Sequence, residues 1–473
     1  MTLTQKLRYN LIGDRIFYKK VILILIPIII QNAVTHIVNL VDNIMVGSVG
    51  TLEMSAVAIV NQLLFVFNLC IFGGLSGAGI FTSQFAGAKD TEGVRHSFRM
   101  KIYIALCVCA VAIAVFLLIP KTLIGMYISE NTSVSDATKT LGFGLDYLYI
   151  IIIGLIPFAV SQIYGSTLRE LGETKLPMIA SVAAIGINII FNYVLIFGNE
   201  GLAFLPFAPM GVVGAAIATS LSRYVEMLII IISVHKNSEK YDFIKNVYKS
   251  FKIPLDLCHE ILKKGVPLLF NEFLWSFGMA FLMQCYSVRG IEVVASTNIA
   301  STVGNMFNVV YFSIGAAISI MCGQHMGAGE LEKAKTTVWR LLFLSIISCL
   351  VVGSILLSLS SVIPMVYNTT DTVRHLATEL LCVLALLMPF NAFCHGCYFA
   401  MRSGGKTIIT MIFDSGFIWL ISCPIAYIIA HYTNLNIVPF YLAVQGIEAV
   451  KAIIAGILIK KGFWINNMVA KKD

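Results

Sequence analysis

The segment Gln84–Asp90 reads QFAGAKD, and the segment Gln324–Glu330, 240 residues later, reads QHMGAGE. Both begin with glutamine, carry glycine and alanine at the fourth and fifth positions, and end in an acidic residue. The same offset aligns three further pairs: Pro27 with Pro267, Gly50 with Gly290, and Asn68 with Asn308. Because polar loop residues rarely match at one constant offset by chance, we expect the chain to be an internal duplication.

The composition predicts that the chain lies in a membrane. Of its 473 residues, 58% are hydrophobic and 12% are charged, whereas a soluble domain carries about 25% charged residues. Apolar runs of at least about 18–20 residues predict transmembrane helices. Twelve such runs are present, at 21–45, 54–82, 98–120, 141–167, 176–198, 209–234, 262–285, 293–322, 338–361, 376–400, 407–430 and 437–460.

The distribution of lysine and arginine predicts the orientation. Both ends of the chain and alternate loops are rich in these residues, whereas the opposite loops hold Lys121, Lys139, Arg289 and Arg374. By the positive-inside rule, we expect both termini in the cytoplasm and the protein in the plasma (inner) membrane. The net charge of +8 would then face anionic membrane lipids, so nucleic-acid binding is not expected. The first apolar run lacks a small-residue cleavage site, so no cleavable signal peptide is expected.

A long polar stretch follows the sixth apolar run, at about 235–264. We interpret it as a cytoplasmic linker and expect an N-lobe at 1–234, a linker at 235–261 and a C-lobe at 262–473. Because each half has six spans, both halves enter the membrane in the same orientation. The expected fold is therefore all-α and polytopic, with twelve transmembrane helices in two six-helix lobes related by a pseudo-two-fold axis along the membrane normal.

Polar residues form a row on the first span. Asn32, Thr35, Asn39 and Asp42 are spaced by 3, 4 and 3 residues, so they share one helix face. An ionised group at a helix centre costs about 2.5–3.5 kcal/mol, so it is expected to face a water-filled cavity or a cation. The alternative is that Asp42 caps the outer end of the span. Pro27 removes a backbone hydrogen bond below this row and is expected to bend the helix.

Glu272 is the corresponding acid of the second half, inside the seventh span. Ser276 continues its helix face. We expect a functional carboxylate here, and the alternative is an interfacial ion pair with Lys264. Two further rows share helix faces by spacing, and each is expected either to line the cavity or to pack helices through amides: Asn188 with Asn192, and Asn391 with His395 and Tyr398.

Other candidate groups are interpreted as structural. Arg223 with Glu226, and Glu448 with Lys451, are i,i+3 pairs of opposite charge, and pairing lowers the cost of burial. Asp414 has no assigned role.

The pair Cys394 and Cys397 has CxxC spacing but lacks a second ligand pair, so no metal site is expected. No catalytic constellation is present in the sequence, so the protein is not expected to be an enzyme.

The motifs together resemble the multidrug and toxic compound extrusion (MATE) family of bacterial transporters. The resemblance covers nearly the whole chain in family order. It is carried by VDNIMVG (41–47), QFAGAKD (84–90), LRELGETKLPM (168–178), NIIFNYVLIFG (188–198), MGVVGAAIATSLS (210–222) and MRSGGKT (401–407).

The resemblance implies secondary active export of organic, cationic, drug-like compounds by antiport with Na⁺ or H⁺. It implies a rocker-switch cycle, a monomer, and no cofactor besides the coupling ion. A cation site in the N-lobe is implied at Asp42, Asn188, Asn192 and Thr219, and a cation or substrate site in the C-lobe at Glu272 and Asn391. Family members often carry an acid at the positions of Asn192 and Asn391, so the coupling ion and the coupling lobe stay open.

Three alternatives are less favoured. A lipid or lipid-linked glycan flippase of the same superfamily would need arginines or lysines in its cavity, and the spans are expected to offer only Arg223 and Lys451, each next to an acid. A membrane enzyme or receptor would need a catalytic constellation or an extramembrane domain. A major-facilitator carrier would need its arginine-rich loop after the second helix, where this chain has QFAGAKDTEGVRHS.

Overall fold

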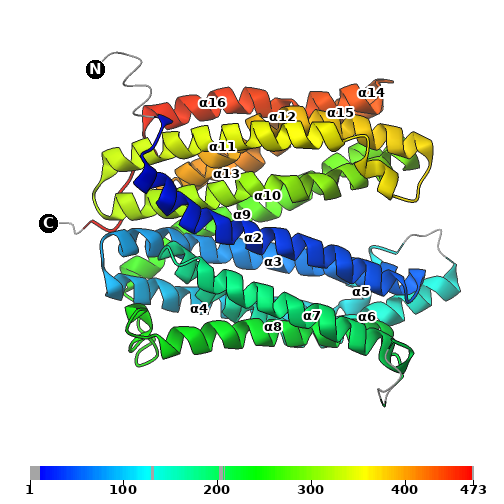
Figure 1. The fold of residues 1–473 in the computed structure, drawn as a ribbon, viewed down its shortest axis with the longest axis horizontal. Coiled ribbons are helices and arrows are strands. Elements are labelled where there is room, and N and C mark those ends of the chain that lie inside the picture. Colours follow the sequence, from blue (N-terminus) through cyan, green and yellow to red (C-terminus); the bar gives the residue numbers. More distant parts are fainter. Residues whose placement is uncertain (1–10, 129–132, 202–205, 207, 471–473) are drawn as a thin grey trace. The chain divides into compact units, whose positions relative to one another are not determined.

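The computed structural model describes residues 11–128, 133–201, 206 and 208–470, without the side chains of 38–40 and 43. In these residues the regular structure is entirely helical (Figure 1). Twelve helices are long and apolar enough to cross a membrane. This confirms the predicted all-α fold with twelve spans.

The first ten spans are single helices: α2 (Arg15–Gly47), α3 (Thr51–Gly87), α4 (Thr91–Leu118), α6 (Val134–Glu170), α7 (Lys175–Gly201), α8 (Gly211–Lys236), α9 (Leu255–Ser287), α10 (Ile291–Gly327), α11 (Leu331–Leu359) and α12 (Asp371–Ser403). The eleventh consists of α13 (Thr407–Met411), two π-helical segments η3 (Ile412–Gly416) and η4 (Ile418–Ser422), and α14 (Cys423–Tyr432). The twelfth consists of α15 (Ile437–Gln445) and α16 (Ile447–Lys461). Short helices lie between spans: α5 (Pro120–Gly125), η1 (Asp242–Ile244) and η2 (Ile363–Val366).

Helix lengths repeat between the two halves as the duplication predicts. Helices α2 and α9 each have 33 residues, and α3 and α10 each have 37. Helix α4 has 28 residues and α11 has 29. Most helices are longer than the apolar runs, because their polar first and last turns continue the helical hydrogen bonding beyond the apolar segment.

The chain forms two compact units, and α2, α3 and α9 each contribute to both. Unit 1 contains Met1–Ile29, Ile80–Asp90 and Glu260–Asp473, and unit 2 contains Ile30–Gly79 and Thr91–His259. Helix α9 begins at Leu255, inside the range expected for the linker. The lobe boundaries inferred from the sequence stay a prediction.

The core of unit 1 is built on α10 and α12. Helix α11 packs against both, and α16 runs alongside α12 (Figure 1). Small residues let these helices approach closely. A Cβ at Gly396 of α12 would overlap Leu342 of α11, and one at Gly315 of α10 would overlap Phe399 of α12. The first half of α2 adds apolar side chains such as Ile24 to the same core.

The core of unit 2 is built on α6, α7 and α8, with α4 packed on α6. Gly214 of α8 lies against the backbone of α7, where an added Cβ would be 2.6 Å from the carbonyl carbon of Leu195. This close approach brings the polar faces of α7 and α8 within hydrogen-bond distance of each other.

The segment after α8 is docked on α4 instead of extending freely. The guanidinium of Arg99, whose residue is only 4% exposed, donates to the carbonyl of Val247 at 2.9 Å and to that of Lys252 at 3.4 Å. The ring of Phe98 packs on Phe243 with centroids 5.4 Å apart. The expected linker is therefore fastened to the first turns of α4 over residues 243–252.

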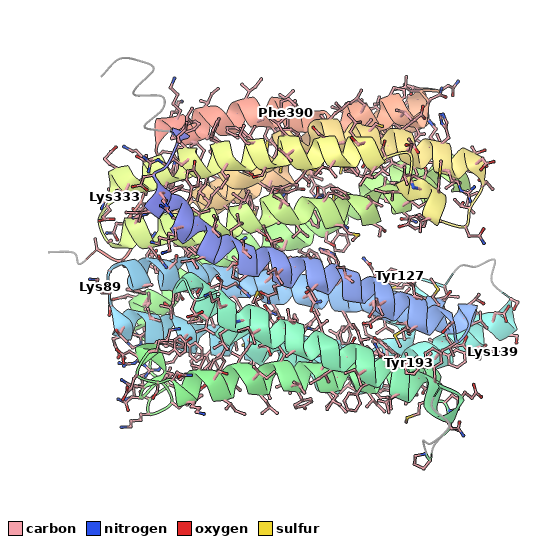
Figure 2. The ribbon with its side chains drawn as sticks, in the orientation of Figure 1. Lys89, Tyr127, Lys139, Tyr193, Lys333 and Phe390 are labelled. Carbon is pink, nitrogen blue, oxygen red and sulfur yellow. The ribbon has the colours of Figure 1, made fainter. Side chains whose placement is uncertain are left out.

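The two motif copies that open the sequence contact each other in unit 1. A Cβ at Gly87 would overlap the backbone of Gln324, and a Cβ at Gly327 would overlap the backbone of Gln84. Only glycine fits at these two positions without displacing the facing helix. Lys89 and Lys333, which lie in or just after the two copies, are found at the same end of the unit (Figure 2).

The side chain of Gln84 fastens the C-terminal segment. It is fully buried, and its Nε2 donates to the carbonyls of Ser403 and Asn466, each at 3.1 Å. Its Oε1 accepts from the amide of Met468 at 2.8 Å. One side chain thus joins the ends of α3 and α12 to the tail.

Candidate functional site

Asp42 of α2 lies beside the buried amides of α7 in unit 2. Nδ2 of Asn192 donates to Oδ1 of Asp42 at 2.6 Å. The amide of Asn188 reaches the same carboxylate when its nitrogen and oxygen are exchanged, with Nδ2 then 3.0 Å from Oδ1. The Asn188 amide also lies 3.4 Å from the hydroxyl of Thr219 on α8. We call these four residues the Asp42 site.

One amide oxygen of the Asp42 site has no hydrogen-bond partner among the described residues. Oδ1 of Asn192 is buried and accepts no hydrogen bond from the part of the chain that the structure describes. Buried polar atoms are nearly always hydrogen-bonded in folded proteins. An acceptor without a donor, on an amide that already contacts a carboxylate, is the kind of group that binds a cation or a water molecule.

A second polar connection joins the same three helices. Nε2 of Gln31 on α2 donates to Oγ of Ser181 on α7 at 2.8 Å, and Ser181 donates to Oε1 of Glu226 on α8 at 2.5 Å. Glu226 also pairs with Arg223 at 3.5 Å, as the spacing predicts. The guanidinium of Arg223 lies 4.9 Å from the ring centroid of Phe158.

The other members of the polar row on α2 differ from Asp42. Thr35 is exposed and donates its hydroxyl to the carbonyl of Gln31 on its own helix at 2.8 Å. Asn32 is half-buried, and the side chain of Asn39 lies outside the described residues. Pro27 lies inside α2, which continues as one helix from Arg15 to Gly47. The predicted bend and the cavity-lining roles stay predictions.

Glu272 of α9 contacts two residues of α12 in unit 1. The hydroxyl of Tyr398 donates to Oε1 of Glu272 at 3.3 Å, and Nη1 of Arg402 lies 3.7 Å from the same oxygen. Arg402 also donates to the Tyr398 hydroxyl at 3.3 Å. The cation that the structure places at Glu272 is therefore Arg402 instead of Lys264.

The polar contacts continue from Glu272 to α16. Nδ2 of Asn271 donates to the Tyr398 hydroxyl at 3.3 Å and to Oδ2 of Asp414 at 3.0 Å. Lys451 lies 3.5 Å from Oδ1 of Asp414 and 3.1 Å from Oε1 of Glu448, so the predicted pair Glu448 and Lys451 is present. We call Glu272, Arg402, Asp414, Lys451 and Glu448, joined by Asn271 and Tyr398, the Glu272 network.

Three further predicted residues lie on the same helices. Ser276 is half-buried one turn after Glu272, and Asn391 is half-buried two turns before Tyr398. His395 packs its ring against Tyr311 and Phe312, with centroids 5.0 and 4.7 Å apart. Its Nδ1 is buried and has no hydrogen-bond partner in the described part of the chain.

The prediction that the spans offer only Arg223 and Lys451 as cations is wrong. Lys101 of α4 is fully buried and contacts Glu170 of α6 at 2.5 Å. Arg402 is buried in the last turn of α12. Lys101 stands inside the apolar run 98–120, so it could have been found as an ionisable residue in a span. Arg402 was missed because α12 extends beyond the apolar run that ends at 400.

Comparisons with known proteins agree with this architecture. A model of the family described as MatE matches the chain twice, over residues 27–194 and 267–428. A probable multidrug resistance protein NorM of Bacillus anthracis is 28% identical over 418 residues, which are 88% of this chain and 89% of that protein. A protein of the same name from Thermotoga maritima is 23% identical and covers 96% of this chain and 95% of its own length.

Solved structures share the fold. A multidrug resistance MATE family transporter of the MOP superfamily, in an outward-facing conformation, superposes with a TM-score of 0.82 at 20% identity, over 96% of this chain and 97% of its own. A MOP superfamily transporter from Pyrococcus furiosus, described as having a binding pocket of reverse polarity, gives 0.82 at 19% identity over 98% of each chain. Because the family model matches both halves and most of the length, this chain belongs to the MatE family and is a multi-pass membrane protein.

Proposed function

We propose that this protein is a secondary active transporter that exports organic, cationic, drug-like compounds in exchange for Na⁺ or H⁺. Membership of the MatE family and relatives named as probable multidrug resistance proteins support drug efflux. We further propose that the protein works as a monomer in the plasma membrane with both termini in the cytoplasm.

The observation that carries the coupling proposal is the Asp42 site. A carboxylate, two buried amides and a hydroxyl from three helices meet there, and Oδ1 of Asn192 has no donor among the described residues. Carboxylate, amide and hydroxyl oxygens are hard ligands that suit Na⁺, in the way they suit other hard cations. Na⁺ would be held by Asp42 and the amide and hydroxyl oxygens, whereas H⁺ would neutralise Asp42 alone.

The coupling follows from competition between ion and substrate. A cationic compound is attracted by the same negative charge that the ion neutralises, so each lowers the affinity for the other, and this coupling is reciprocal. Transport requires that both ligands distinguish the inward-facing from the outward-facing state. We propose that rocking of the two lobes supplies these states, so that an ion entering from outside releases the compound outward.

The test uses the purified protein in proteoliposomes with a fluorescent cationic dye and an imposed pH or Na⁺ gradient. We expect gradient-driven dye movement for the wild type and its loss in Asp42→Asn. Asp371→Asn is the matched control, because it makes the same change at a carboxylate whose side chain is 97% exposed; it should transport like the wild type. Dye movement that persists in Asp42→Asn under both gradients would refute the role of Asp42.

A lipid or lipid-linked glycan flippase is the second candidate, because Lys101 and Arg402 add buried cations. An anionic headgroup needs cations whose charge is available. In the described residues, however, Lys101, Arg402, Lys451 and Arg223 each lie within 4 Å of a carboxylate. A fluorescent-lipid scrambling assay on the same vesicles separates the two proposals, and we expect no lipid movement above protein-free vesicles.

A further inference from the structure

The segment between α8 and α9 has a basic side and an apolar side. Residues 236–252 contain five lysines and two acidic residues. All five lysines are exposed, whereas four apolar or aromatic side chains of the same stretch are buried: Tyr241, Phe243, Ile244 and Val247. The buried side fastens the segment to unit 2, so its lysines project from a surface instead of from a free chain.

Helix α4 fixes the backbone beneath the last of these lysines. Besides the bonds from Arg99 described above, the hydroxyl of Tyr103 donates to the carbonyl of Phe251 at 3.1 Å. The amide of Lys249 donates to the carbonyl of Asn246 at 3.1 Å. Asn246 has a left-handed backbone conformation with φ 63°, which asparagine adopts more readily than most residues. A ligand that binds this surface therefore loses little free energy to ordering of the backbone.

The lysines of the segment differ in whether a carboxylate already binds them. Nζ of Lys240 contacts Oε2 of Glu173, and Nζ of Lys245 lies 2.7 Å from Oδ1 of Asp242. Lys249 and Lys252 are exposed and form no ion pair within the described part of the chain. Their ammonium groups, each with three donors, are therefore available to the oxygens of a phosphate group.

A row of aromatic rings runs beside the two unpaired lysines. The consecutive ring centroids of His235, Tyr248, Phe251 and Tyr103 lie 6.0, 6.3 and 6.5 Å apart. The last three residues of the row are between 42% and 46% exposed. The hydroxyl of Tyr248 hydrogen-bonds to that of Tyr164 on α6, which holds its ring in place. Exposed aromatic rings next to lysines are typical of the membrane interface, where the ring lies among headgroups and the ammonium reaches water.

The row ends on a face of α4 that is exposed inside an apolar run. Tyr103 lies five residues into the run 98–120, and Leu106, one turn later on the same face, is 58% exposed. An exposed leucine within a membrane span contacts lipid. Because helical side chains point toward the N-terminus, the hydroxyl of Tyr103 reaches back toward the start of the run, where it binds the linker. This places Phe251 at the level of the lipid headgroups.

We propose that Lys249 and Lys252, with the rings of Tyr248 and Phe251, form a binding site for the headgroup of an anionic phospholipid beside α4. The lysines bind the phosphate, and the rings pack against the glycerol and the first carbons of the acyl chains. With both termini in the cytoplasm, as proposed above, the lipid belongs to the inner leaflet, whose negative surface potential attracts basic segments. The lipid stays at the rim of the protein and is not transported.

The test measures the affinity of fluorescent phosphatidylglycerol for the full-length protein in non-ionic detergent, by fluorescence anisotropy. We expect the double variant Lys249→Gln with Lys252→Gln to bind about 25-fold more weakly, since one lysine near an anionic surface contributes about fivefold. The matched control is Lys240→Gln with Lys245→Gln, which removes the same charge from the same segment at lysines that already have a carboxylate. At about 0.15 M salt, where charges act over about 8 Å, the control should bind like the wild type.

The control separates a defined site from general attraction to positive charge. Equal weakening in the two double variants, or unchanged affinity in Lys249→Gln with Lys252→Gln, would overturn the proposal. Phosphatidylcholine that binds as tightly as phosphatidylglycerol would also overturn it, and so would inorganic phosphate that displaces the lipid at equal concentration.

Hydrogen exchange locates the bound lipid and checks the fold. Phosphatidylglycerol should slow exchange of the amides in residues 248–252 of the wild type, and unchanged exchange there would contradict the site. Both double variants should share the wild-type melting midpoint, because the substituted side chains are exposed. None of these measurements follows dye movement, so failure of the lipid site leaves the transporter proposal standing.

Discussion

Replacing Glu170 by glutamine is expected to destabilise the protein strongly, because Lys101 would keep its charge without a counter-ion. The ammonium of Lys101 is fully buried between α4 and α6 and contacts Oε2 of Glu170 at 2.5 Å. It also donates to the hydroxyls of Ser166 and Thr167, each at 3.0 Å. Both hydroxyls donate in turn to the carbonyl of Ile163, which leaves their lone pairs for the ammonium.

The magnitude follows from this arrangement. Removing one partner of a buried ion pair costs about 3–5 kcal/mol. Two neutral acceptors stay with Lys101, and the side chain of Glu170 is 17% exposed, so we expect the lower end, about 3 kcal/mol. That free energy corresponds to roughly a hundredfold change in the folded-to-unfolded ratio.

The double variant Lys101→Met with Glu170→Gln gives the sharper test. Methionine has nearly the volume of lysine and carries no charge, and replacing a buried pair by apolar groups is often neutral. We therefore expect the double variant to recover to within about 1 kcal/mol of the wild type. Recovery by a second substitution cannot arise if each change acts only by disturbing helix packing.

Thermal denaturation of the detergent-purified protein, followed by size-exclusion chromatography, ranks the variants. We expect Glu170→Gln to have the lowest midpoint temperature of thermal denaturation, and the double variant to have a midpoint close to that of the wild type. Lys139→Met, which removes an exposed lysine, is the control and should melt with the wild type. A Glu170→Gln protein that melts with the wild type, or a double variant that melts below Glu170→Gln, would refute the reasoning.

Three further substitutions test the packing of unit 1. Gly87→Ala should abolish folded protein on size-exclusion chromatography, because the new Cβ would overlap the backbone of Gln324; Gly125→Ala, where a Cβ meets nothing within 4 Å, should be tolerated. Arg289→Gln should lower the free energy of unfolding by about 2 kcal/mol, because the guanidinium donates to four carbonyls at the end of α14 and just after it; an unchanged melting midpoint would contradict this. Gln84→Leu should accelerate hydrogen exchange in the C-terminal tail, and unchanged protection there would show that this glutamine does not hold the tail.

The spans and the duplication could be predicted because each leaves a pattern in the sequence. In lipid, the backbone N–H and C=O groups of a span must form their hydrogen bonds within the helix, and its side chains are mostly apolar. A span therefore appears in the sequence as one continuous apolar run. The Asp42 site was also within reach, because Asn188 and Asn192 share a helix face and Asp42 ends a polar row. The family resemblance already implied that these residues and Thr219 form one site, and the structure adds the hydrogen bonds that join them.

The Glu272 network could not be predicted in the same way. Asp414 and Lys451 lie on different helices, and no spacing rule relates positions that meet only through packing. The π-helical turns that aim Asp414 have no signature in residue types. The docking of residues 243–252 was also invisible, because Arg99 binds backbone carbonyls there and these carry no sequence information.

The reciprocal contact between the two motif copies has a consequence for the origin of the protein. Gly87 faces Gln324 and Gly327 faces Gln84, and these residues exchange places under the repeat offset. A contact in which residue i meets j and j meets i is that of a two-fold symmetric homodimer. A half-length ancestor with this motif would thus have self-associated through it without a new surface. Joining two such copies in one chain would preserve this contact unchanged.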